Sequence, residues 1–243
     1  MTKKENSLAD LMTRLSQGSD TIIVNPNGIE KLREKGVPIE IAHNKTLPEL
    51  FKERLESAIK LEKELPPVPN EFFSQSIRSL YREIQECILF SLNGAAITLS
   101  AILIEFTLKR TTYTKEVGGY GEYDPEKWEE FEKMDFGESI GRAKKVGLLG
   151  SKPAKELKSF RKNIRNPYIH YNLRSITKGA VVEKAKILNF ETQQYEEKDM
   201  YADDNPIIQS YAKPFVDKGN VITVFEFADA IVKYLINRLE EKL

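Results

Sequence analysis

An arginine, an asparagine and a histidine lie close together in the sequence, as Arg165, Asn166 and His170. The guanidinium of Arg165 stays charged at physiological pH, and its planar set of N–H donors matches phosphate oxygens. His170 supplies an imidazole, the side chain that most readily serves as a base or an acid in proteins. Asn is a favoured helix N-cap and Pro a favoured first helical residue, so Asn166-Pro167 predicts a helix kink or restart between them. This group favours chemistry on an anionic phosphate.

The residues before this group predict a basic helix that leads into it. From Arg142 to Arg174 the sequence has ten Arg or Lys and one acid, in a chain of zero formal net charge. This excess favours a track for a phosphate backbone, and the alternative is a solvated helix face. The apolar and basic side chains are spaced to lie on roughly opposite faces. The expected apolar face holds Leu157, Phe160 and Ile164, and the expected basic face holds Lys155, Lys158, Lys162 and Arg165.

The composition is that of an ordinary globular protein, with 40% hydrophobic residues. Cys87 is the single cysteine, so no disulfide can form within the chain and no cysteine cluster can hold zinc, which predicts a reducing, cytoplasmic environment. The N-terminus lacks the apolar core of a signal peptide. The longest apolar run, Ala95 to Leu108, is interrupted by polar residues and is shorter than the ~20 residues of a membrane span. It predicts a buried helix, and we expect no membrane association.

Hydrophobic periodicity predicts an all-α protein. Each periodic segment carries one apolar stripe that must be buried, so the segments should pack as a mainly antiparallel helical bundle. A helix over Leu47 to Leu65 precedes them and ends at the proline run Pro66 to Pro69, the best candidate boundary. We expect an N-terminal extension of mixed or helical structure over 1–70 and a helical domain over 71–243. The periodic segments are 72–92, 94–110, 137–149, 152–174 and 223–241.

The last third of the chain carries two further expectations. The strand-like runs Val181 to Phe190 and Gln193 to Tyr201 predict a short β-hairpin or another structured insertion within 175–220. Thr223 and Glu226 form a capping-box pattern, which predicts that the last helix starts there.

Other candidate residues are expected to have ordinary structural roles. Glu105, an acid in apolar surroundings, should pair with an arginine or a helix end rather than act as a catalytic carboxylate. His43 has no nucleophile or carboxylate nearby and should lie in a surface loop. The stretch Glu116 to Glu138 has nine acids and two lysines. Without a histidine or a regular Asp spacing, it predicts a solvated acidic face rather than a metal site.

Arg165-Asn166, followed after three residues by His170, resembles the signature of the HEPN superfamily, an all-helical domain of prokaryotic ribonucleases, toxins and anti-phage effectors. The resemblance covers roughly residues 72–243 and implies a HEPN-like antiparallel helical bundle. The toxin branch encoded beside a nucleotidyltransferase antitoxin has a tyrosine where this chain has Asn172. The surroundings that share the resemblance are the helix ending Leu103-Ile104-Glu105, the segments Phe136 to Ile140 and Gly147 to Leu149, and the helix Leu157 to Ile164.

The resemblance implies a metal-independent endoribonuclease that needs no cofactor. In such enzymes the RNA 2′-hydroxyl attacks the adjacent phosphate and leaves a 2′,3′-cyclic end. Arg165 would stabilise the phosphorane, His170 would act as base or acid, and Asn166 would orient His170 or bind phosphate, unless it is only an N-cap. Lys162 would contact phosphate, as would Lys155 and Lys158 on the basic face, and Tyr171 would stack on a base.

The resemblance also implies an assembly, because one imidazole cannot readily serve as base and acid at once. A two-fold homodimer that presents two motifs to one cleft would supply both groups. The expected partners are RNA, a second copy of the chain, and an antitoxin or other regulator. The rival hypothesis is a non-catalytic HEPN-like module for nucleotide binding or oligomerisation. In that case Arg165 would be a structural residue paired with Glu105, and His170 a satisfied core residue.

Overall fold

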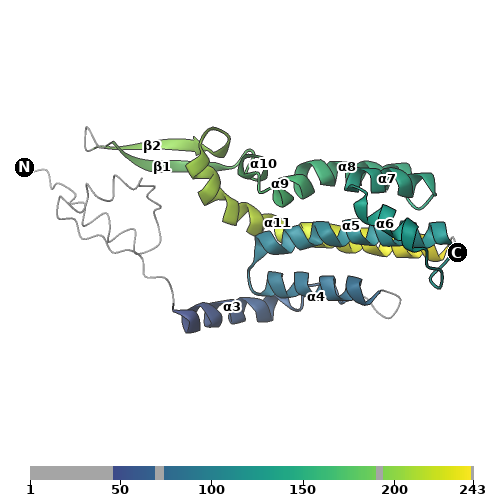
Figure 1. Cartoon of the computed structure of the whole chain (residues 1–243). Coiled ribbons are helices and arrows are strands. Elements are labelled where there is room, and N and C mark those ends of the chain that lie inside the picture. The colour runs from purple at the N-terminus through teal and green to yellow at the C-terminus, as the bar shows by residue number, and fades with distance from the viewer. Residues whose placement is uncertain (1–45, 69–73, 190–193, 242–243) are drawn as a thin grey trace, which may run out of the picture.

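The computed structural model describes residues 46–68, 74–189 and 194–241. In these ranges the chain is mainly helical, with one two-stranded antiparallel sheet (Figure 1). The expectation of a helical protein with a short hairpin is therefore confirmed. His43 and most of the expected N-terminal extension lie outside the described residues.

Helix α5, Asn93–Val117, is the helix around which the others pack. Its buried residues include adjacent pairs, such as Ala96 with Ile97 and Leu103 with Ile104, which cannot lie on a single face, as expected for a helix with neighbours on several sides. Helices α4 and α11 run along it in Figure 1. Between α4 and α5 the chain turns at Ser91, whose φ is 58°. The packed helices are α4 Gln75–Leu89, α7 Phe136–Lys145 and α11 Pro206–Glu240.

Helix α6, Pro125–Lys133, lies within the acid-rich stretch, where the sequence analysis expected only a solvated face. Asp124 caps it by accepting the Lys127 N–H at 3.0 Å, and Pro125 occupies its first turn. The helix buries the Phe131 side chain, whose ring packs edge-on against Tyr113 of α5. This helix was not predicted, because its one apolar side is surrounded by many acidic residues.

The basic helix reaches the motif through a π turn. Helix α8, Ser151–Phe160, continues into η1, Arg161–Arg165, and then into α9, Asn166–Ile169. Pro167 has no N–H to donate to the preceding turn, which accounts for a widened turn here. The Asn166 backbone is helical, with φ −65° and ψ −45°, and its N–H donates to the Arg161 carbonyl. Asn166 is therefore not an N-cap: of the predicted kink or restart, the restart is wrong, and the chain passes through the π turn without leaving the helix.

Helix α10, Leu173–Ile176, follows α9. The hairpin comes next and consists of β1, Val181–Asn189, and β2, Gln194–Tyr201. The 3₁₀ turn η2, Ala202–Asp204, follows the hairpin. The strands pair from Val181 opposite Tyr201 to Asn189 opposite Gln194.

The start of the last helix was predicted wrongly. Helix α11 begins at Pro206 and not at Thr223. Asn205 caps it by accepting the Ile207 N–H at 2.9 Å. Pro214 and Gly219 lie inside the helix, and both residue types normally interrupt helices. Packing outweighs this preference, because one side of this part of the helix is buried through Ala212, Asp217 and Val221.

Helix α3, Leu47–Leu61, begins with a capping box between Thr46 and Glu49. None of its residues is fully buried, and Leu47, Phe51, Leu55 and Ile59 are exposed. Beyond its end, Leu65 and Val68 pack against the hydrophobic core. The side-chain amide of Gln85 on α4 also donates to the Pro66 carbonyl at 2.6 Å.

Gly94 lies where α5 begins, against a charged pair on α11. A Cβ at this position would lie 2.8 Å from Asp217 Oδ2 and 2.9 Å from Lys213 Nζ. Because Asp217 is buried and held by Lys213 and Tyr168, we expect Gly94→Ala to lower the free energy of unfolding by about 1 kcal/mol or more in urea denaturation.

Gly141 on α7 is the matched control, because a Cβ there meets nothing within 4 Å. Gly141→Ala should raise the free energy of unfolding by about 0.4–1 kcal/mol. Equal effects of the two substitutions would contradict the close approach at Gly94.

Candidate functional site

Arg165 reaches inward from the end of η1 to the central helix α5. Its Nε and Nη2 donate to Oε2 of Glu105 at 3.2 and 3.0 Å. The two side chains are 22% and 17% exposed, so the ion pair is partly shielded from water. The prediction that Glu105 pairs with an arginine is confirmed. The same contact is the one expected if Arg165 had only a structural role.

The guanidinium of Arg165 nevertheless keeps some donor capacity. Its Nη1 donates to Asn166 Oδ1 at 3.1 Å, so three of its five N–H groups are engaged. Among the described residues, no group accepts the other two. Glu105 also pairs with Lys109, 3.3 Å away, so two cations share one carboxylate. The cluster of Arg165, Lys109 and Glu105 therefore has a net charge of +1.

His170 lies at the C-terminal end of α9 and is exposed. Within the described residues, no hydrogen bond or ion pair involves its imidazole, so the rival expectation of a satisfied core histidine is wrong. Tyr171 follows in the left-handed conformation, with φ 49°, and its side chain is 65% exposed. Asn172 caps α10 by accepting the Ser175 N–H at 3.1 Å. The two candidate side chains that follow the π turn are thus open to solvent.

The helix that carries the motif is anchored between Arg165 and His170. The Tyr168 hydroxyl donates to Asp217 Oδ1 on α11 at 2.7 Å, and Lys213 pairs with the same carboxylate. Burial, followed by the hydrogen bond to Asp217, raises the pKa of Tyr168 well above its usual value. Tyr168 therefore remains a donor at physiological pH. Lys213 also lies over the Tyr171 ring, 5.3 Å from its centroid.

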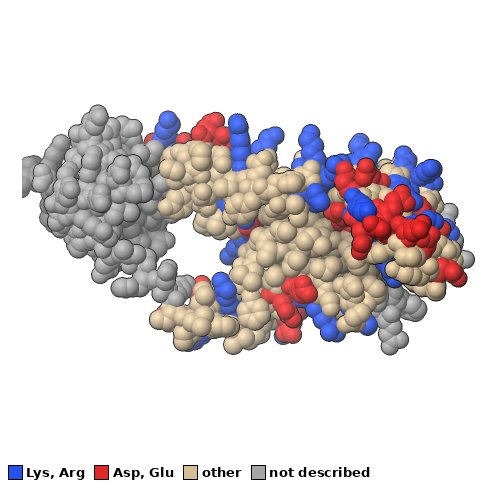
Figure 2. Space-filling model, viewed as in Figure 1, with Lys and Arg blue, Asp and Glu red and all other residues tan. Residues whose placement is uncertain are grey.

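The lysines of the basic face are exposed, as predicted. Lys155, Lys158 and Lys162 all project into solvent, while Leu157 and Phe160 are buried. Figure 2 shows cationic side chains along the edge formed by α7 to α10 and acidic side chains gathered over α6. Ile164 is half-buried.

Arg165 does not share the exposed basic face, and its assignment to that face is wrong. The π turn changes the angular spacing between Lys162 and the motif, and Arg165 points instead to Glu105 on α5. The structure brings together Arg165, Asn166 and Glu105, and it leaves the lysines and Tyr171 outside this group.

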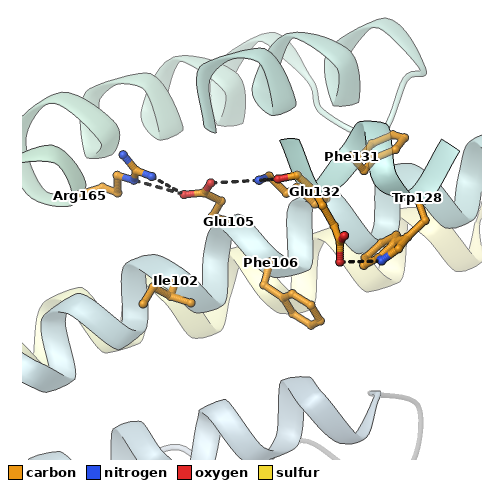
Figure 3. A pocket seen from close by; sticks show the side chains of 8 residues that line it. Ile102, Glu105, Phe106, Trp128, Phe131, Glu132 and Arg165 are labelled. Carbon is orange, nitrogen blue, oxygen red and sulfur yellow. Dashed lines mark hydrogen bonds and ion pairs between the residues drawn. The ribbon is translucent and has the colours of Figure 1, made fainter. Parts of the chain in front are cut away.

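A pocket of about 450 Å³ opens beside Arg165, between α5 and α6. In Figure 3, Arg165 stands at one end and Trp128 at the other, joined by contacts through Glu105 and Glu132. The Trp128 Nε1 donates to Glu132 Oε1 at 2.9 Å, and Lys109 Nζ lies 3.5 Å from the Glu132 carbonyl oxygen. Ile102 and Phe106 provide apolar surface. Ion pairs and aromatic rings therefore line the same pocket.

The pocket residues Lys109, Trp128 and Glu132 were not predicted from the sequence. Lys109 follows Glu105 by four residues, which is the spacing of a helical ion pair and was a usable signal. Trp128 and Glu132 have the same spacing in α6, but that helix was not predicted.

No group of three or more potential metal ligands occurs in the described part of the chain. No helix in those ranges is long and apolar enough to cross a membrane. Comparisons with models of known families, with curated proteins and with solved structures give no match to the chain.

Proposed function

We propose that the protein is a metal-independent endoribonuclease of HEPN type that acts as a cytoplasmic toxin or anti-phage effector. The observation that carries the proposal is that the arginine and the histidine of one motif are in different environments. Arg165 is fixed by Glu105 but keeps two N–H donors, and His170 is exposed without a partner among the described residues. A fixed cation suits phosphorane charge, and a free imidazole suits proton transfer.

The proposed reaction follows from these two groups. The His170 imidazole takes the proton of the 2′-hydroxyl, whose oxygen attacks the adjacent phosphorus while Arg165 donates to the phosphate oxygens. The bond from phosphorus to the 5′-oxygen then breaks, and the leaving oxygen takes a proton from a second imidazolium. A homodimer supplies this second group as His170 of the other protomer. The exposed Lys155, Lys158 and Lys162 bind the RNA backbone.

The alternative is a non-catalytic module of HEPN type for nucleotide binding or oligomerisation. The Arg165–Glu105 ion pair is the observation that favours it, because it gives the arginine a structural role. The exposure of His170 speaks against this alternative, because the histidine contributes nothing to the core.

Cleavage in the presence of EDTA tests the proposed function. The purified full chain should cut single-stranded RNA without added metal and leave 2′,3′-cyclic phosphate ends, which phosphatase resistance before acid treatment reveals. Sedimentation under the same conditions should give the mass of a dimer. A 27.9 kDa particle that still cleaves RNA would rule out the two-protomer site. Absence of cleavage by the folded wild type, with its assembly intact, would favour the non-catalytic module.

A further inference from the structure

The pocket between α5 and α6 has an unusual distribution of charge. Arg165 and Lys109 contribute two positive charges, and Glu105 and Glu132 contribute two negative charges. Glu105 lies between the two cations, accepting from Arg165 and forming an ion pair with Lys109, whereas the Glu132 carboxylate lies with Trp128 at the far end. The pocket is therefore neutral overall, with a cationic end and an anionic end. An isolated anion is complementary in charge to the cationic end alone.

The cationic end has donors available for a phosphate. Two N–H groups of Arg165 have no acceptor among the described residues, and the guanidinium lines the pocket. Glu105 holds Arg165 through Oε2 and Lys109 through Oε1, so this end of the pocket carries two fixed cations beside one carboxylate.

The other end is suited to a planar ring with N–H donors. Trp128 and Phe106 line the pocket with ring surface, on which a base can stack. The Trp128 indole fixes Glu132 through Oε1, so Oε2 and the remaining lone pair of Oε1 can accept from a ligand. Guanine presents two adjacent donors, N1–H and the N2 amino group, which match the two oxygens of one carboxylate. Uracil, adenine and cytosine each place an acceptor beside their donor.

We propose that this pocket binds a guanine nucleotide of the RNA, with its phosphate at Arg165 and its base against Trp128 and Glu132. The inference rests on the proposed function for its choice of RNA as the source of the nucleotide. It assigns base selectivity to α6, an element that lies outside the motif. Binding at equilibrium is independent of catalysis, so the two proposals can fail separately.

Trp128 is the single tryptophan of the chain, so its fluorescence reports on this pocket alone. Titration of the full chain with guanosine 3′-monophosphate should change the emission saturably. Uridine 3′-monophosphate should bind at least ~10-fold more weakly, the scale of one bidentate base contact. Guanosine and inorganic phosphate, which each engage one end, should also bind more weakly. Equal affinity for the two nucleotides would overturn the proposal.

Glu132→Gln tests the carboxylate, because it keeps the shape and replaces one acceptor oxygen by a donor. It should remove the preference for guanosine 3′-monophosphate, and wild-type selectivity in this variant would overturn the proposal. Glu129→Gln is the matched control, because Glu129 is exposed on the same helix and pairs with Lys133 outside the pocket. Selective nucleotide binding without any RNA cleavage would uphold the pocket and reject the ribonuclease. RNA cleavage without base preference would uphold the ribonuclease and reject the proposed guanine pocket.

Discussion

Alanine in place of Arg165 or His170 is expected to slow RNA cleavage by at least ~100-fold while the protein stays folded. Loss of Arg165 removes the donors that stabilise phosphorane charge, and loss of His170 removes the group that transfers the proton. The fold should tolerate both changes. Glu105 keeps Lys109 as a partner at 3.3 Å, and His170 is exposed. Single-turnover cleavage and thermal unfolding of each variant measure the two effects separately.

Arg82→Ala is a matched control for the arginine, because Arg82 is an exposed residue of α4 outside the site. It should cleave at the wild-type rate and show the wild-type dependence on salt within error. If Arg165→Ala unfolds the protein while the wild type shows no nuclease activity, the ion pair with Glu105 is structural. Wild-type cleavage rates in both motif variants would also reject the proposed mechanism.

A 2′-deoxy sugar at the cleaved nucleotide is expected to abolish cleavage at that position. The 2′-oxygen is the proposed nucleophile, so its removal stops the reaction before His170 or Arg165 can act. The measurement uses one RNA of defined sequence, cut at a mapped position, with a single deoxynucleotide placed there. The same substitution several nucleotides away should leave the rate unchanged, because it leaves the nucleophile in place. Cleavage of the modified position, or of DNA, would show that a water molecule attacks instead.

The central helix and the hairpin could be predicted because their signals are local. The apolar run Ala95 to Leu108 lies within α5, and the two strand-like runs became β1 and β2. The first half of α11 could not be predicted, because Pro214 and Gly219 oppose a helix and only packing of the surrounding residues overrides them.

The site was only partly predictable for a similar reason. Arg165, Asn166 and His170 were recognised from their spacing, and Glu105 was expected to pair with an arginine. The predicted direction of the Arg165 side chain was wrong. Helical periodicity assumes a constant angle per residue, and the π turn Arg161–Arg165 departs from that angle. Trp128 and Glu132 of the pocket come from α6, which was not predicted because it is rich in acidic residues.

The π turn makes the motif sensitive to chain length rather than to composition. A π turn holds one more residue than an α-helical turn of the same rise, and one residue corresponds to about 100° of helix rotation. Deleting Asn163 from this turn would therefore rotate the lysine face relative to the arginine, although every proposed functional side chain would remain. An insertion or deletion at Asn163 or Ile164 would thus separate the lysine face from the site, whereas a substitution there would leave their relative angle unchanged.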